Sequence, residues 1–289
     1  MHTITTEDIM ENIVITGVTS GFGINWLYEL DKGSDITFFI LARNEEKFNS
    51  LLKQNPLTNS IHFIQCELDS FQSIANAVNS VKTLTNTVDT LINNAGVWSS
   101  NKFSTSKDNI EITVAVNQLA PYLLTGQLLP LLKNSVNPKV INTASFRHKD
   151  AKVDIKDIEL RETFNAEQAY CNSKLYSVLF TKKLAQLLKS TNITVNCFDP
   201  GIVDTPMLKD AFPKSLSLIY PIFRKYIARS PQKGAETGVY LSQTLICQTV
   251  SGEYFKDAKI KAVSNNGNNQ SLIDWLWNES IRLTGFKYA

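Results

Sequence analysis

The stretch IVITGVTSGFG, residues 13–23, leads from a short apolar run directly into a turn that contains Gly17, Gly21 and Gly23. Such a β-branched run is typical of a buried strand, and the residues that follow, Gly23–Leu30, have the apolar spacing of a helix. Glycines allow a backbone to turn tightly beside a pyrophosphate, and the N–H groups at a helix start favour negative charge. The stretch therefore predicts a strand, a phosphate-binding turn and a helix.

The same alternation of short apolar runs and amphipathic segments continues along the chain. Further buried strands are expected at Ile36–Leu41, Ile61–Cys66, Thr90–Asn93, Val140–Ala144 and Ile193–Phe198, and further helices at Ser70–Val81 and Ala166–Leu188. Repeated strand–helix alternation predicts an α/β fold, a doubly wound parallel sheet of the Rossmann type with right-handed crossovers. Because no linker interrupts the pattern, residues 1–289 are expected to form a single dinucleotide-binding and catalytic domain.

Residues 205–230 break this alternation with an irregular stretch that contains several prolines and the apolar run Leu216–Phe223. An insertion after the sixth strand lies at the carboxyl edge of the sheet, where ligands of such folds bind. The stretch is interpreted either as a substrate loop or as a surface helical hairpin, and the residues alone do not decide between them. A third interpretation, contact of Leu216–Ala228 with a membrane surface, also stays open.

Composition excludes several classes of protein. The formal net charge of +2 is small and evenly spread, so no nucleic-acid partner is expected. The longest apolar stretch, Ala120–Leu132, is interrupted and too short for a membrane span, and the first residues lack a signal-peptide pattern. We expect a cytoplasmic protein without a metal site, whose widely spaced cysteines are reduced and structural: Cys66, Cys171, Cys197 and Cys247.

The end of the second expected strand indicates which dinucleotide is preferred. A site for NAD would offer a carboxylate there, but the sequence has Ala42 followed by Arg43, which suits a 2′-phosphate. This favours NADP(H) over NAD(H). The alternative is that Arg43 is an ordinary solvated residue, with Glu45 and Glu46 beside it.

Tyr170 and Lys174 lie one turn apart on the same face of an expected helix. Lowering a tyrosine pKa from about 10 to about 7 takes about 4 kcal/mol. A cation about 4 Å away supplies about that much at an effective dielectric constant near 20. Lys174 is therefore sufficient to make Tyr170 a general acid or base, although a Tyr-x-x-x-Lys pair by itself is common on protein surfaces.

Together with other motifs, the pair of Tyr170 and Lys174 gives the chain a resemblance to a known family. The chain resembles the short-chain dehydrogenase/reductase family, and within it the retinol dehydrogenase and WW-domain oxidoreductase group. The motifs that carry this likeness occur in the family's order at Thr16–Gly23, Asn93–Gly96, Asn117, Ser145, Tyr170–Lys174 and Pro200-Gly201. The segments 116–125, 230–237 and 251–255 carry the closer likeness.

The resemblance implies roles for individual residues. Tyr170 would transfer a proton, Ser145 would hydrogen-bond the substrate oxygen, Lys174 would lower the tyrosine pKa and hold the nicotinamide ribose, and Asn117 would position a water. The cofactor would contact Gly17, Ser20, Gly21, Phe22, Gly23, Arg43, Glu67, Leu68, Asn94, Ala95, Gly96, Tyr170, Lys174, Pro200, Gly201, Val203 and Thr205. Glu67 stands where the family usually has aspartate.

Together these features predict an enzyme: an NADP(H)-preferring oxidoreductase that moves a hydride to or from a carbonyl or alcohol group of a fairly apolar small molecule. The alternative is a nucleotide-binding regulator or scaffold that uses the fold without turnover. The resemblance also makes a homo-oligomer possible.

Overall fold

The computed structural model describes residues 10–99, 102–212, 214–243 and 249–288, so Cys247 lies outside the described residues. Their strands are β1 (Glu11–Thr16), β2 (Ile36–Ala42), β3 (Ser60–Gln65), β4 (Thr90–Asn93), β5 (Lys139–Thr143), β6 (Thr194–Asp199), β7 (Tyr254–Lys256) and β8 (Lys259–Ile260). The longer helices are α1 (Gly23–Leu30), α2 (Glu45–Gln54), α3 (Phe71–Leu84), α5 (Ala120–Lys133), α6 (Ala166–Leu187), α9 (Pro231–Gln243) and α10 (Gln270–Thr284). Shorter helical segments are α4 (Ile112–Val114), η1 (Ala115–Leu119), η2 (Phe146–Asp150), α7 (Pro206–Ala211), η3 (Lys214–Ile219), α8 (Tyr220–Tyr226) and η5 (Asn266–Asn268).

The strands form one sheet in the order β3-β2-β1-β4-β5-β6-β7-β8. All neighbouring pairs are parallel except β7 with β8. The order in which strands are added reverses between β1 and β4, because β2 and β3 lie on one side of β1 and the later strands lie on the other. In open α/β sheets the crevice at such a switch point binds ligands. The predicted fold class, a doubly wound parallel sheet of the Rossmann type, is confirmed.

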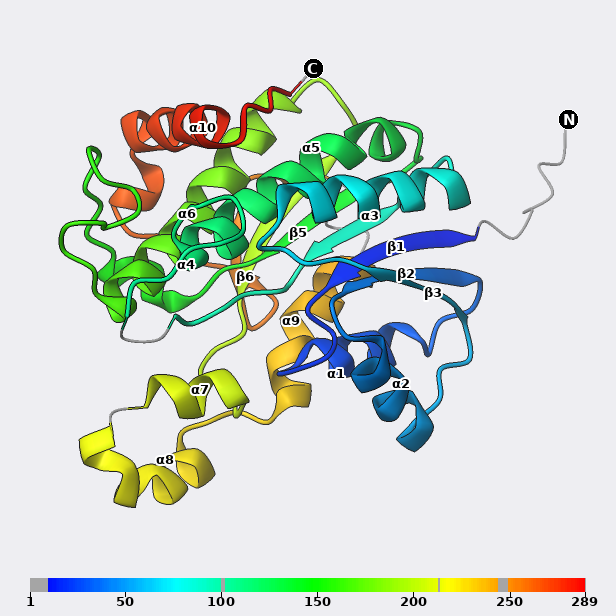
Figure 1. Cartoon of the computed structure of the whole chain (residues 1–289). Helices are drawn as coiled ribbons and strands as arrows, with labels where there is room; N and C mark the ends of the chain where they lie inside the picture. Colours follow the sequence, from blue (N-terminus) through cyan, green and yellow to red (C-terminus); the bar gives the residue numbers. More distant parts are fainter. Residues whose placement is uncertain (1–9, 100–101, 213, 244–248, 289) are drawn as a thin grey trace, which may run out of the picture.

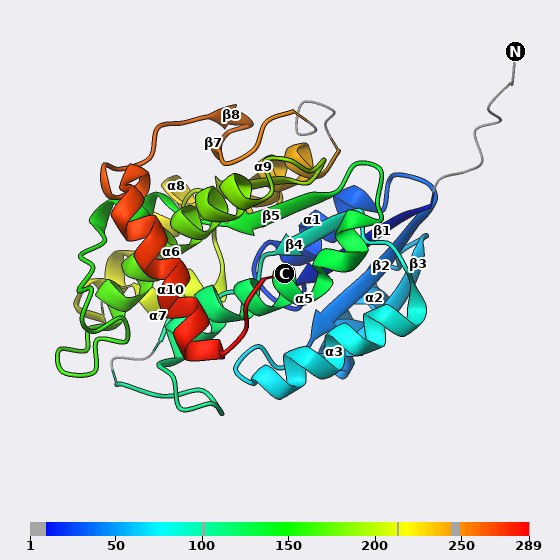
Figure 2. The same cartoon turned by 90° about the horizontal axis from the view of Figure 1, so that it is seen from above.

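Helices cover both faces of the sheet, with α3, α5, α6 and α10 on one face and α1, α2 and α9 on the other (Figures 1 and 2). The strands need cover on both faces because they are apolar on both: in β1, Ile13 and Ile15 point into one apolar core and Val14 points into the other. Trp26 of α1 is fully buried against Gly238 of α9, where an added Cβ would lie 2.7 Å from the indole.

Within residues 205–230, α7, η3 and α8 form a small helical lobe that projects from the body (Figure 1), so the stretch is helical, as the second interpretation has it, although its start also lines the cavity described below. The strands β7 and β8 were not expected at all. They are only three and two residues long, and a run that short has no readable periodicity.

The described cysteines are free and buried, as expected: Cys66, Cys171 and Cys197. Among the described residues, no helix combines the length and the apolar character that crossing a bilayer requires.

Candidate active site

The turn after β1 has a backbone shape that requires glycine. Gly17 and Gly21 adopt φ angles of +76° and +66°, which L side chains rarely adopt. A Cβ at Gly17 would lie 2.7 Å from the backbone of Ala95, and one at Gly23 would lie 2.2 Å from the Gly17 carbonyl oxygen. Helix α1 follows, and its N-cap residue Phe22 offers no side-chain hydrogen bond. The first N–H groups of α1 therefore stay available for a negative charge.

Thr16 and Asn94 hold this turn against the end of β4. The Thr16 hydroxyl accepts hydrogen bonds from the backbone N–H groups of Asn94 and Ala95, both at 3.0 Å. The Asn94 amide donates in return to the carbonyl oxygens of Thr16 at 3.2 Å and Gly17 at 3.1 Å. These bonds cross the switch point of the sheet and give the turn one defined position.

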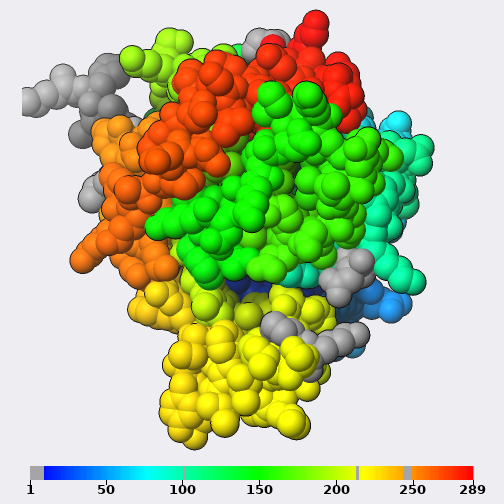
Figure 3. Space-filling view, turned by 90° about the vertical axis from the view of Figure 1, so that its left-hand side faces the viewer, coloured from blue at the N-terminus to red at the C-terminus, as the bar shows by residue number. Residues whose placement is uncertain are grey.

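A cavity of about 300 Å³ runs along the carboxyl ends of the strands. That volume lies within the range of small-molecule and cofactor sites. On the β2 and β3 side the lining residues are Leu41, Ala42, Arg43, Cys66, Leu68 and Asp69; in the middle Gly17, Thr19, Ser20, Gly21, Phe22, Asn94, Ala95, Gly96 and Val97; on the β5 and α6 side Thr143, Ala144, Tyr170 and Lys174; and on other elements Ile112, Val116, Pro200, Thr205, Pro206 and Met207. Figure 3 shows the hollow between the body and the yellow lobe.

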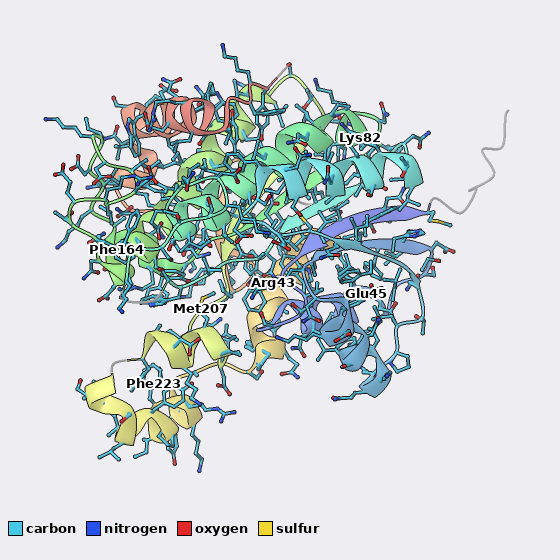
Figure 4. The ribbon with its side chains drawn as sticks, viewed as in Figure 1. Arg43, Glu45, Lys82, Phe164, Met207 and Phe223 are labelled. Atoms are coloured by element: carbon cyan, nitrogen blue, oxygen red, sulfur yellow. The ribbon has the colours of Figure 1, made fainter. Side chains whose placement is uncertain are left out.

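Arg43 lies on this lining just after β2, and Met207 of α7 lines the same cavity (Figure 4). The side chain of Arg43 is exposed and makes no ion pair with any residue of the described ranges. Neighbouring Asn44 caps α2 by accepting a bond of 2.7 Å from the Lys47 N–H, and Glu45 begins that helix. The arrangement leaves the Arg43 guanidinium at the cavity without a carboxylate partner.

Ser145 and Tyr170 come from different elements and lie beside each other, and Tyr170 lines the other end of the cavity. Ser145 follows β5, and Tyr170 lies in the second turn of α6. The Ser145 hydroxyl is close enough to the phenol to lower the pKa of Tyr170. The indole of Trp98 packs on the phenol, with 4.7 Å between the ring centres. The phenol of Tyr170 therefore lies beside the Ser145 hydroxyl and is covered by the ring of Trp98.

Lys174 is one turn beyond Tyr170, as the spacing predicts. Its Nζ donates to the carbonyl oxygen of Thr143 at 3.0 Å and lies 5.5 Å from the centre of the Tyr170 ring. Burial lowers the pKa of Lys174 to about 8, and the negative charge of Asp199 opposes that shift.

The expectation that Lys174 depresses the pKa of Tyr170 is wrong for the chain alone. Burial raises the pKa of Tyr170, and Asp199 raises it further, while Arg147 and the Ser145 hydroxyl lower it by less. The physical reason is geometric: the Lys174 amine lies over the phenol ring and bonds to Thr143, and it is itself desolvated.

Asn117 lies in the π-helical segment η1, a type of local widening that is frequent at functional sites. Its Oδ1 accepts from the Val97 N–H at 2.8 Å, and its Nδ2 donates to the Val97 carbonyl and to the Ser173 hydroxyl, both at 3.0 Å. Asn117 and Lys174 line a second hollow of about 10 Å³. That is close to the smallest volume that holds one water.

Four residues expected at the cofactor do not line the cavity. Gly23 packs against Gly17, and Glu67 forms an ion pair with Lys107 while its neighbour Leu68 lines the cavity instead. The other two lie beside the lobe: Gly201 has φ +82° and packs on the Arg229 side chain, and Val203 is buried against Gly234.

The sequence reasoning missed Trp98 and His148. His148 is fully buried, its Nδ1 lies 2.8 Å from the Ser145 carbonyl oxygen, and its Nε2 accepts from the Ser264 N–H at 3.1 Å. Burial lowers the pKa of His148, so the ring is neutral and carries its hydrogen on Nδ1. Its place three residues after Ser145 was the available signal. No signal indicates Trp98, because its contact with Tyr170 is long-range.

The comparisons with known proteins agree with this geometry. The family model described as short chain dehydrogenase matches residues 11–215. Retinol dehydrogenase 12 of Bos taurus is 31% identical over 280 residues, which cover 96% of this chain and 87% of that protein. Polyprenol dehydrogenase of Homo sapiens is 31% identical over 281 residues, covering 94% of this chain and 84% of that protein.

Solved structures share the fold at lower identity. A protein from Mycobacterium paratuberculosis superposes with a TM-score of 0.78 at 21% identity, covering 96% of this chain and 95% of that one. The NADPH-bound carbonyl reductase from chicken fatty liver gives a TM-score of 0.64 at 21% identity, with 88% of this chain and 99% of that chain covered.

Proposed function

The chain belongs to the short chain dehydrogenase family, close to the retinol dehydrogenases, and from that premise we propose that it is an NADP(H)-preferring oxidoreductase. It transfers a hydride between the nicotinamide and the carbonyl or alcohol carbon of a fairly apolar small molecule. The observation that carries the proposal is that Tyr170 and Lys174 line one end of a cavity whose middle is a glycine turn, with Ser145 beside Tyr170.

The cavity fits a dinucleotide. Gly17 and Gly21 leave room that a Cβ would fill, and the start of α1 faces negative charge. The exposed Arg43 suits a 2′-phosphate, since a guanidinium binds phosphate through paired hydrogen bonds. When bound, the nicotinamide supplies or accepts the hydride.

Residues of the protein donate the proton to the substrate oxygen and replace it afterwards. Because burial raises its pKa, Tyr170 keeps its hydroxyl hydrogen at neutral pH and can donate it to a carbonyl oxygen. The Ser145 hydroxyl, which lies beside the phenol, stabilises charge on that oxygen. The ammonium group of Lys174 lies beside the phenol. A water in the hollow that Lys174 and Asn117 line can return a proton to Tyr170.

An apolar substrate is supported by the apolar part of the cavity's lining. Val97, Ile112, Val116 and Met207 line that cavity, and Trp98 covers the phenol. Apolar walls around a few polar groups are typical of sites for apolar molecules, because the desolvated surface contributes to binding.

The proposal is tested by substituting Tyr170→Phe and screening aldehydes, ketones and quinones with NADPH. We expect turnover to fall at least about 100-fold, the scale of a lost general acid, with NADPH affinity largely kept. The matched control is Tyr176→Phe on the same helix, whose hydroxyl lies outside the cavity. Near-normal turnover in Tyr170→Phe contradicts the role of Tyr170. A wild-type chain that binds NADPH yet turns over no carbonyl supports the non-catalytic alternative.

A further inference from the structure

The helical lobe formed by residues 206–228 has an exposed apolar surface. Of the large hydrophobic side chains that are exposed among the described residues, half fall within residues 216–227. They are Leu216, Leu218, Ile219, Ile222, Tyr226 and Ile227, with exposed fractions of 47%, 93%, 49%, 62%, 72% and 55%. Single exposed hydrophobic residues are ordinary, but a contiguous group of them marks an interaction site.

Other side chains make ring contacts and an ion pair of the lobe. Phe212 makes the lobe's inner aromatic contacts, with ring centres 4.9 Å from Tyr220 and 5.1 Å from Phe223. An ion pair of 2.6 Å between Arg224 and Asp204 ties α8 back to the chain that enters the lobe. The lobe therefore has contacts of its own that do not involve the exposed apolar side chains.

The charge of the segment indicates what covers this surface. The lobe contains four basic residues, Lys209, Lys214, Arg224 and Lys225, and one acidic residue, Asp210; residues 214–228, which carry the exposed apolar side chains, contain no aspartate or glutamate. The Lys225 Nζ lies 5.3 Å from the centre of the exposed Tyr226 ring, at the edge of the apolar group. Apolar residues, an interfacial aromatic ring and basic residues together are the composition of helices that lie in the surface of an anionic bilayer.

A second copy of the chain fits the surface less well. In a two-fold interface the same patch is buried on both copies, so the exposed cation of Lys225 would be brought into an interface with no acidic residue of the segment 214–228 to pair with it. Interfaces between proteins are also depleted in lysine, whereas anionic headgroups attract it.

We propose that residues 216–227 dock the protein on the surface of an anionic lipid bilayer. Helix α8 has seven residues, so the lobe lies on the membrane and does not cross it. Pro206 and Met207 begin the lobe and line the catalytic cavity, and the hollow opens beside the lobe (Figure 3). Docking would place this opening next to the bilayer, from which an apolar alcohol or carbonyl compound could enter. That consequence rests on the proposed function, whereas docking itself does not.

The test is co-sedimentation of the full chain with vesicles of phosphatidylcholine alone and with added phosphatidylserine. We expect binding to the mixed vesicles, weaker binding at high salt, and at least about a ten-fold loss in the double variant Leu218→Glu/Ile222→Glu. The control Val136→Glu/Leu187→Glu adds the same charges at side chains that are 70% and 48% exposed, outside the lobe, and should bind like the wild type.

Three results would overturn docking: no sedimentation of the wild type with mixed vesicles, equal sedimentation of the Leu218→Glu/Ile222→Glu variant, or a wild-type dimer in sedimentation velocity that this variant dissociates. Turnover of a water-soluble carbonyl without vesicles separates this proposal from the proposed function. The variant should keep that turnover. If even the wild type lacks turnover but sediments as expected, the proposed function fails and docking stands.

Discussion

At the scale of single residues, the site concentrates groups that are costly to bury. Lys174 is 5% exposed and Ser145 is 6% exposed, and Asp199 is completely buried close enough to affect the pKa values of Tyr170 and Lys174. Burying a charged amine in this way reduces the stability of the folded chain. The same burial gives Tyr170 and Lys174 an environment in which nearby charges act strongly.

Arg43 tests the preference for NADPH. We expect Arg43→Ala to raise the KM for NADPH about ten-fold, the equivalent of one lost charge-assisted contact, and to leave the KM for NADH nearly unchanged. The control Lys47→Ala removes an exposed cation of α2 that does not line the cavity. An unchanged ratio of the two KM values would rule out the 2′-phosphate contact.

Lys174 predicts a pH dependence of stability. Its pKa falls from the ordinary 10.5 to about 8 in the folded chain. Between these values the unfolded chain holds the proton that the folded chain has lost, so the free energy of unfolding rises with pH. The expected slope is at most about 1.4 kcal/mol per pH unit.

Urea unfolding of the wild type and of Lys174→Met at several pH values measures this effect. The stability of the wild type relative to the variant should increase from pH 8 toward pH 10, since methionine does not titrate. A relative stability that stays constant over this range would show that Lys174 is not desolvated in the folded chain.

At the scale of elements, the connection from β1 to α1 and the end of β4 act as one unit. Thr16 and Asn94 bond the two elements at four places, and Gly17 lets them approach. The turn is therefore rigid before any ligand arrives, which lowers the entropy cost of binding.

Gly17→Ala should disrupt this unit. The new methyl group meets the Ala95 backbone at 2.7 Å on a residue with positive φ, so we expect NADPH binding to be lost and stability to fall by about 1–3 kcal/mol. The control Gly33→Ala adds a methyl group whose nearest contact is the Ile36 side chain at 3.2 Å. Calorimetric titration with NADPH should separate the two variants, and intact binding in Gly17→Ala would contradict the close packing of this turn.

At the scale of the whole molecule, the C-terminal segment covers one face of the domain. Helix α10 packs on α6 (Figure 2), and the residues after it return to α5. Tyr122 of α5 donates to the Phe286 carbonyl at 2.9 Å and accepts at its own carbonyl from the Tyr288 hydroxyl at 2.7 Å. Gly126 permits this contact, because a Cβ there would meet the Phe286 ring at 2.3 Å.

Removing the two aromatic rings should weaken the fold and spare the site. We expect Phe286→Ala/Tyr288→Ala to lower the free energy of unfolding by about 2–4 kcal/mol, the usual cost of truncating partly buried aromatic residues, without changing the KM for NADPH. Lys287→Ala, between the two, serves as the control because its side chain is exposed. Denaturant unfolding and kinetics together check this, and unchanged stability would show that the segment does not hold the domain.

Much of the fold could be predicted because it follows from local patterns. The six longer strands and the start of α1 at Gly23 follow from buried β-branched runs and a glycine turn. Ser145, Tyr170 and Lys174 were identified by spacing and by resemblance, and the structure brings them together.

The sequence by itself therefore determined the six longer strands of the sheet and the glycine turn, since these depend on patterns within a few residues of chain, and its motifs singled out Ser145, Tyr170 and Lys174. Only the tertiary structure decided which way the pKa of Tyr170 shifts, because burial and the charges of Asp199 and Arg147 come from distant segments. It also decided the helical shape of residues 206–228 and the contacts of Trp98 and His148. Those features depend on groups far apart in the sequence that only packing brings together.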